Sequence, residues 1–127
     1  MKFKTESASR LENEWNNPKL APMVKEIVID AAEYAKEKWN WDFVITSIRR
    51  TPAEDARLHA SGIHVDWRAV DMRTRDQSQQ AIDDVANHIN KKYAYDPTRP
   101  HLKVCFKEIH GNAAHAHYQV HPRTKLK

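Results

Sequence analysis

The chain has few of the residues that define several classes of protein. Its 127 residues include one cysteine and two glycines, so a disulfide within the chain is impossible. Cys105 lies in an apolar run, where we expect a small buried hydrophobe rather than a nucleophile. No apolar run approaches the roughly 20 residues of a membrane span, and the N-terminus lacks the apolar core of a signal peptide. We therefore expect a soluble chain that is made in the cytoplasm and does not span a membrane.

The charge is mildly positive, with 21 Lys and Arg against 17 Asp and Glu and a net charge of +4. Such an excess favours anionic partners without choosing among them. Part of it lies in the basic tail, residues 121–127, which we expect to be solvated. No helix-turn-helix, zinc-finger or other nucleic-acid-binding motif accompanies the charge, so we expect no nucleic-acid partner.

Hydrophobic periodicity predicts the order of the main elements. A polar segment, residues 1–21, is anchored by Leu11, Trp15 and Leu20. The predicted helices span residues 22–39, 51–62 and 76–93, and the predicted strands span residues 43–48, 69–72, 102–109 and 117–120. The second helix begins with a capping box formed by Thr51 and Glu54 and ends at Gly62, and the last two strands are joined by a turn at residues 111–112. This order predicts an α+β domain whose helices pack against a small, mostly antiparallel sheet.

Eight histidines are many for this length, and they include two informative clusters. One cluster starts at His64 and ends at Asp71, and the other is His115-Ala-His117. Alternate residues of a strand share a face, so His115 and His117 are expected to point the same way. A carboxylate in the apolar run around Asp71 is costly unless it is paired or binds a cation. We expect the remaining histidines at 59, 88, 101 and 121 to be ordinary surface or core residues.

Three motifs together resemble peptidase family M15, the D-Ala-D-Ala metallopeptidases and phage L-alanyl-D-glutamate endolysins. The family motif Ser-x-His-x-x-Gly-x-Ala-x-Asp is matched from Ser61 to Asp71. The later His-x-His motif is matched by residues 115–117. Upstream, a strand ending in arginine and a helix of the type Ala-Glu-x-Asp-x-Leu are matched by residues 46–58. The resemblance spans about residues 43–120, and three motifs in register are more specific than any one.

The chain departs from the family pattern at several positions. Trp67 replaces the glycine after the histidine, and Ser61 stands three rather than two residues before it. Arg49 replaces the usual tyrosine, so either Arg49 or Arg50 is the functional arginine, and alignment with the following helix favours Arg50. Ala114 stands where an acid commonly precedes His117. The chain therefore resembles the branch in which a histidine replaces that acid.

The resemblance implies one zinc peptidase domain over residues 1–127, with the fold shared by lysostaphin-type enzymes and the hedgehog signalling domain. The implied zinc ligands are His64, Asp71 and His117. A catalytic zinc keeps one further position open for water. Asp66 lies too close to His64 in sequence to be the preferred ligand, and we expect it to be solvated or to lie behind the ligands.

The remaining site residues are also implied by the resemblance. His115 is expected to act as the general base, with Glu108 and His110 as alternatives. Arg50 is expected to anchor a substrate carboxylate or to stabilise the oxyanion, and Trp67 to contact the substrate.

The implied activity is hydrolysis of a peptide bond in bacterial peptidoglycan by a monomeric phage endolysin or a related cell-wall carboxypeptidase or endopeptidase. Such an enzyme acts on the cell wall after release from the cytoplasm. The sequence leaves open whether D-Ala–D-Ala, L-Ala–D-Glu or an interpeptide bridge is cut. The alternative function is a zinc-binding domain of the same fold that binds without catalysis.

Overall fold

The computed structural model describes residues 1–57, 62–110 and 113–127. These residues form four α-helices and one short 3-10 helix. The α-helices are α1 (Ala8–Trp15), α2 (Pro22–Trp39), α3 (Pro52–Arg57) and α4 (Gln79–Lys92), and the 3-10 helix is η1 (Thr5–Ser7). The strands are β1 (Lys2–Phe3), β2 (Val44–Ser47), β3 (Ala69–Arg73), β4 (Tyr93–Ala94), β5 (Cys105–His110), β6 (Ala113–Gln119) and β7 (Lys125–Leu126). In this described part, no helix is both long and apolar enough to cross a bilayer.

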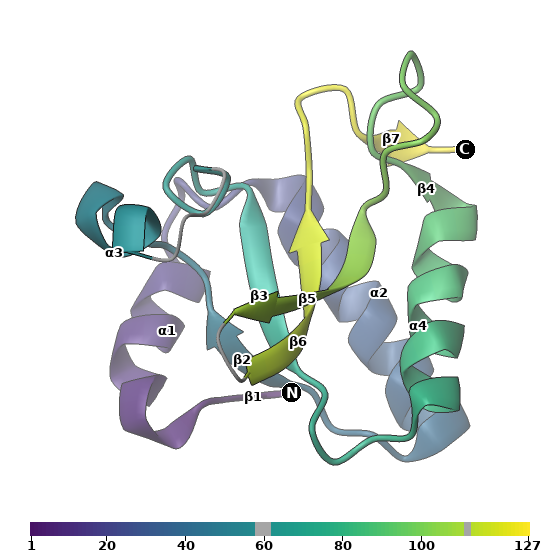
Figure 1. Ribbon diagram of the computed structural model, residues 1–127, viewed down its shortest axis with the longest axis horizontal. Helices are drawn as coiled ribbons and strands as arrows, with labels where there is room; N and C mark the ends of the chain where they lie inside the picture. The colour runs from purple at the N-terminus through teal and green to yellow at the C-terminus, as the bar shows by residue number, and fades with distance from the viewer. Residues whose placement is uncertain (58–61, 111–112) are drawn as a thin grey trace.

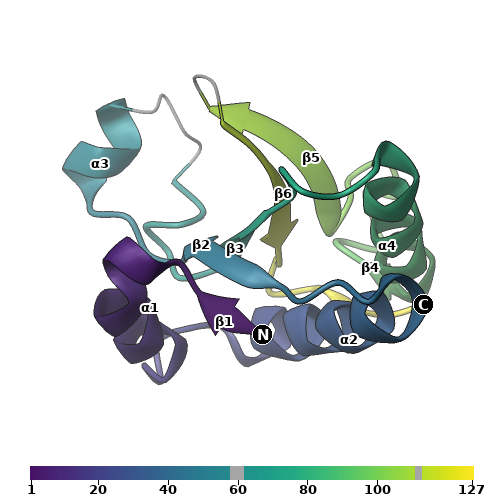
Figure 2. The same ribbon diagram turned by 90° about the horizontal axis from the view of Figure 1, so that it is seen from below.

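The main sheet has five strands in the order β1-β2-β3-β6-β5. Only β1 and β2 pair in parallel, and the other neighbours are antiparallel. Helices α2 and α4 pack together along one side of this sheet, whereas α3 lies on the other side (Figures 1 and 2). The predicted α+β class with a mostly antiparallel sheet is therefore confirmed.

Strand alternation separates the two faces of the sheet. Val70 and Met72 of β3 and Tyr118 of β6 are fully buried in the hydrophobic core under the helices. Because successive side chains of a strand point to opposite faces, the residues between them face away from this core. The face away from α2 and α4 is therefore where Asp71 and His117 lie.

Helix α2 has the bounds and the buried face that the sequence predicts. Pro22 occupies its first turn, where the missing N–H costs nothing. Val24, Ile27 and Ala31 are fully buried. The helix ends at Asn40, whose φ of 49° is the left-handed conformation that commonly terminates helices.

The predicted capping box of α3 is confirmed. The Thr51 N–H donates to Glu54 Oε1 at 2.9 Å, and the Glu54 N–H donates to Thr51 Oγ1 at 3.2 Å. Helix α4 begins three residues later than predicted, because Ser78 caps it by accepting the N–H of Ala81 at 3.1 Å. The predicted end of α3 near Gly62 and the turn at 111–112 involve residues outside the described ranges.

Both chain termini are more ordered than the sequence suggested. Leu11, Trp15 and Leu20 are buried as predicted, but the polar N-terminal segment also forms a strand and a helix. The basic side chains of the tail, Arg123, Lys125 and Lys127, are exposed as predicted, but its backbone is ordered, since β7 pairs with β4. Thr124 fixes this pairing by donating its hydroxyl to the Tyr95 carbonyl at 2.7 Å.

Candidate metal centre

Two neighbouring strands bring the central carboxylate and one histidine together. In the antiparallel pairing of β3 with β6, Asp71 lies directly opposite His117, and Arg73 lies opposite His115. Directly opposite residues share a face of the sheet. Asp71, His115 and His117 therefore lie on the face away from α2 and α4, and His115 and His117 share a face as the period of the His-x-His motif predicted.

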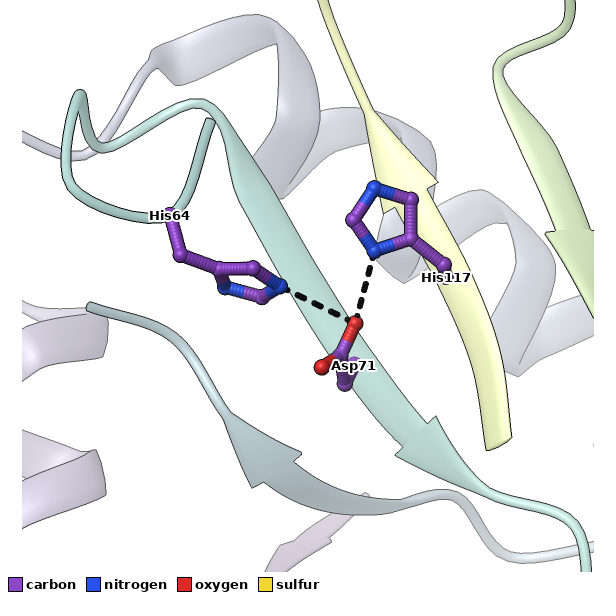
Figure 3. A group of neighbouring side chains, drawn as sticks. All are labelled: His64, Asp71 and His117. Atoms are coloured by element: carbon purple, nitrogen blue, oxygen red, sulfur yellow. Dashed lines mark hydrogen bonds and ion pairs between the residues drawn. The ribbon is translucent and has the colours of Figure 1, made fainter. Parts of the chain in front are cut away.

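His64 reaches the same place from the turn that precedes β3. The turn is held by backbone hydrogen bonds, including Trp67 N–H to the His64 carbonyl at 3.2 Å and Asp66 N–H to the Gly62 carbonyl at 3.1 Å. Gly62 and Trp67 both have positive φ, at 87° and 61°. This conformation suits glycine but is uncommon for tryptophan. The turn directs the His64 ring toward Asp71 (Figure 3).

The three side chains meet at one carboxylate oxygen. Asp71 Oδ1 lies 3.1 Å from His64 Nε2 and 2.8 Å from His117 Nδ1 (Figure 3). His64 and Asp71 are each 2% exposed, and His117 is 4% exposed. One ligand atom from each residue lies within 4.8 Å of the others, so the group has the dimensions of a metal site.

The second nitrogen of each ring is committed as a donor. His64 Nδ1 lies 2.6 Å from the Ile48 carbonyl, which can only accept. His117 Nε2 lies 3.2 Å from Gln119 Oε1, and Gln119 directs that oxygen to the ring because its amide nitrogen donates to the Lys103 carbonyl at 3.0 Å. Each ring therefore has its N–H on the side away from Asp71.

This arrangement leaves two lone pairs facing a carboxylate. When the rings are neutral, His64 Nε2 and His117 Nδ1 have no proton to offer Asp71 Oδ1, and three acceptors converge in a buried space. Such a contact is favourable only if a cation lies among them, either a metal ion or a proton on each ring. Hydrogen bonding of the outer ring nitrogen is also how proteins orient metal-ligating histidines.

The negative charge of Asp71 also favours a cation between the three side chains. Burial by itself would raise the pKa of its carboxyl, but when the facing nitrogens of His117 and His64 carry protons, their hydrogen bonds and positive charge outweigh burial and hold that pKa well below its usual range. A metal ion in place of these protons acts in the same direction, since a nearby positive charge favours the carboxylate. Asp71 is therefore a carboxylate at any physiological pH. Two imidazoles and one carboxylate form a ligand set that zinc accepts.

The other oxygen of Asp71 contacts the predicted catalytic residues. Asp71 Oδ2 lies 2.9 Å from Arg50 Nη2 and 3.3 Å from His115 Nε2. Arg50 is 6% exposed, and its Nη1 also lies 3.9 Å from Asp55 Oδ1. Arg50 thus points into the centre. Arg49 instead lies half-buried with its guanidinium 5.9 Å from the centre of the Trp67 ring.

Glu108 lies beside the same centre on the neighbouring strand. It faces His115 across the β5–β6 pairing, and its Oε2 lies 3.5 Å from His117 Nδ1. Glu108, His115 and His117 form a second group with metal-site dimensions, and it shares His117 with the first. Glu108 is only partly buried, with 26% of its side chain exposed. His110, the other alternative base, has a side chain outside the described part of the structure.

A cavity of about 610 Å³ opens beside the centre, and we call it the site cavity. Its inner wall includes Asp71, His115 and Arg50, and it extends along β2 toward α1 and α3. Trp67 is not among its lining residues. A substrate in this cavity would lie next to the predicted catalytic histidine.

Other predicted assignments have mixed outcomes. Asp66 is solvated as predicted, with 62% of its side chain exposed. His88 is an ordinary structural residue, stacked on Tyr34 at 3.9 Å and bonded to Asp30. His101 is exposed, whereas His59 and Ser61 lie outside the described ranges.

The sequence interpretation missed the groups that orient the two ligand rings. Gln119 had a signal, because it continues the period of two that runs through His115 and His117 and so shares their face. The carbonyls of Ile48 and Lys103 had none, since any residue supplies a carbonyl. Comparisons with protein-family models, curated proteins and solved structures found no match for this chain.

Proposed function

We propose that the protein is a zinc metallopeptidase that hydrolyses a peptide bond in bacterial peptidoglycan, as a phage endolysin or a related cell-wall carboxypeptidase or endopeptidase. The observation that carries the proposal is the convergence of His64 Nε2 and His117 Nδ1 on Asp71 Oδ1, with both outer ring nitrogens already used. A cation resolves this contact. The open cavity beside it provides access for a substrate.

The turn before β3 also supports the proposed relationship to peptidase family M15 and its zinc-peptidase fold. The family pattern has a glycine where this chain has Trp67, and Trp67 adopts the positive φ that favours glycine. A glycine, as in the family pattern, would adopt this conformation without the strain that tryptophan incurs.

The proposed chemistry divides among the residues around Asp71. His64, Asp71 and His117 would hold a zinc ion, which would supply Lewis-acid activation of water and of the peptide carbonyl. His115 lines the site cavity and can take the proton of the attacking water and return it to the leaving amine. Arg50 lies on the same wall and can bind a carboxylate or the developing oxyanion.

Digestion of purified peptidoglycan tests the proposal directly. Zinc-loaded protein is expected to release new peptide ends that mass spectrometry identifies, and a chelator is expected to abolish the release. Cleavage that is indifferent to the chelator would remove the metal from the mechanism. The identity of the new ends also decides which bond is cut.

The His115→Ala variant separates an enzyme from a non-catalytic zinc-binding domain. An enzyme is expected to keep one zinc per chain and lose turnover, because His115 is outside the proposed ligand set. His101→Ala is the matched control, since this exposed histidine belongs neither to the two groups with metal-site dimensions nor to the lining of the site cavity. Zinc binding by the unaltered chain without cleavage of any murein type would support the binding-domain alternative.

A further inference from the structure

The positive charges that line the site cavity fall into two groups. Arg10 and Arg50 are paired, because Arg10 contacts Glu14 at 2.9 Å and Glu54 at 3.0 Å, and Arg50 contacts Asp71 at 2.9 Å. These pairs use every acidic residue among the lining side chains. With five cations and three carboxylates among its lining residues, the cavity keeps an excess of positive charge.

The second group consists of Lys4, Arg49 and Arg57. Among the residues that the structure describes, none of these three side chains forms an ion pair. The buried Nε of Arg49 also lacks a hydrogen-bond partner in the described part of the chain. An unpaired guanidinium or ammonium beside a concave surface attracts an anionic group.

The three cations come from separate segments that are fixed relative to one another. Lys4 follows β1, and its N–H donates to the Ile45 carbonyl of β2 at 2.8 Å. Arg49 follows β2, and its N–H donates to Glu14 of α1 at 3.2 Å. Arg57 ends α3, which is tied to α1 through the contact of Arg10 with Glu54. The cluster is therefore part of the fold.

The lining of the cavity suits carboxylates in particular. A guanidinium offers two parallel N–H groups that match the two oxygens of a carboxylate. Hydroxyl groups on the same walls, from Ser7, Thr46 and Ser47, provide further donors. The same lining includes Asp71 and His115, where the proposed reaction takes place.

We propose that the site cavity binds the carboxylate-bearing part of an acidic peptide, with Lys4, Arg49 and Arg57 recognising its carboxylates. This inference rests on the proposed peptidase function and names the class of substrate. One side of the cleaved bond then lies along β2, between α1 and α3. A neutral peptide of the same length is a poorer substrate.

Steady-state kinetics on two synthetic wall peptides test this inference. One peptide has free carboxylates and the other has the same carboxylates amidated. For the acidic peptide, Lys4→Ala and Arg57→Gln are each expected to raise KM about five- to tenfold with kcat changed less than about twofold, since each removes a charge-assisted contact. For the amidated peptide, KM is expected to be high already and insensitive to either variant.

Matched controls remove the same charges elsewhere. Lys19→Ala and Arg75→Gln alter exposed side chains that do not line the site cavity, and they are expected to leave KM unchanged. Equal KM values for the two peptides, or an equal effect of the control variants, would overturn the inference. Inhibition by inorganic phosphate as strong as that by the acidic peptide product would also overturn it, because it would indicate a general anion site.

Calorimetric binding of the acidic peptide to the zinc-loaded chain distinguishes the two proposals. Binding that weakens in Lys4→Ala without any cleavage would support the carboxylate site and oppose the peptidase. Cleavage that does not depend on carboxylates would support the peptidase and oppose the carboxylate site. Absence of both binding and cleavage would overturn both.

Discussion

Replacing Asp71 with asparagine is expected to destabilise the metal-free protein by about 3 to 5 kcal/mol, because breaking a buried ion pair leaves an uncompensated charge. Asp71 is 2% exposed and its Oδ2 lies 2.9 Å from Arg50 Nη2. The other acid near Arg50 is Asp55, at 3.9 Å from Nη1. In the variant, the guanidinium, which is 6% exposed, would keep an ion pair with a described residue only at this longer distance.

The same substitution is expected to remove stabilisation by zinc. Zinc at about 100 times its Kd should stabilise the unaltered chain by about 2.7 kcal/mol, if it binds only the folded state. A neutral amide is a weak ligand, so this increment should disappear in Asp71→Asn. The combined losses, about 6 to 8 kcal/mol, exceed the whole stability of a protein at the lower end of the common range of about 5 to 15 kcal/mol.

Urea unfolding in chelator and in zinc measures the two effects separately. The control is Asp66→Asn, because Asp66 belongs to the same segment but has 62% of its side chain exposed. This control should change stability by less than about 0.5 kcal/mol. The reasoning is refuted if Asp71→Asn stays within about 1 kcal/mol of the unaltered chain in chelator, or if it retains the full zinc increment.

Three further predictions concern residues outside the centre. The hydrogen bond from Arg10 is the main cause that lowers the pKa of the Glu54 carboxyl from 4.5 to about 2. A lowered pKa stabilises the folded chain above the pKa of the unfolded state, so this contribution is lost as the pH falls from about 5 to 2. Acid unfolding curves of Glu54→Gln should therefore show a shallower loss of stability than those of the unaltered chain. Burial raises the pKa of the Cys105 thiol to about 12. A thiol reagent at about pH 8 should therefore modify Cys105 only after the chain unfolds. Rapid labelling of the folded chain would contradict the burial of this thiol. Ser78→Ala removes the cap of α4 and should cost about 1 kcal/mol in urea unfolding, whereas an unchanged midpoint would show that the cap contributes nothing.

Local patterns predicted the elements that bury an apolar stripe. The spacing of Val24, Ile27 and Ala31 identified α2, because a helical period of 3.6 places them on one face. The Thr51–Glu54 capping box likewise identified the start of α3. Helix α1 was missed although it has local signals, since Leu11 and Trp15 lie four residues apart on its buried face and Arg10 pairs with Glu14 one turn later. The two-residue strands at the termini exist only through pairing with other segments.

The sequence by itself also determined the types of side chain available to the candidate centre and the shared face of His115 and His117, since alternation along a strand is a local property. Only the tertiary structure decided that β3 lies beside β6 with Asp71 opposite His117. It likewise decided that the Ile48 carbonyl and Gln119 hold the two rings with their lone pairs inward. These contacts depend on segments that folding brings together, and a carbonyl that receives an imidazole N–H leaves no mark in the amino-acid sequence.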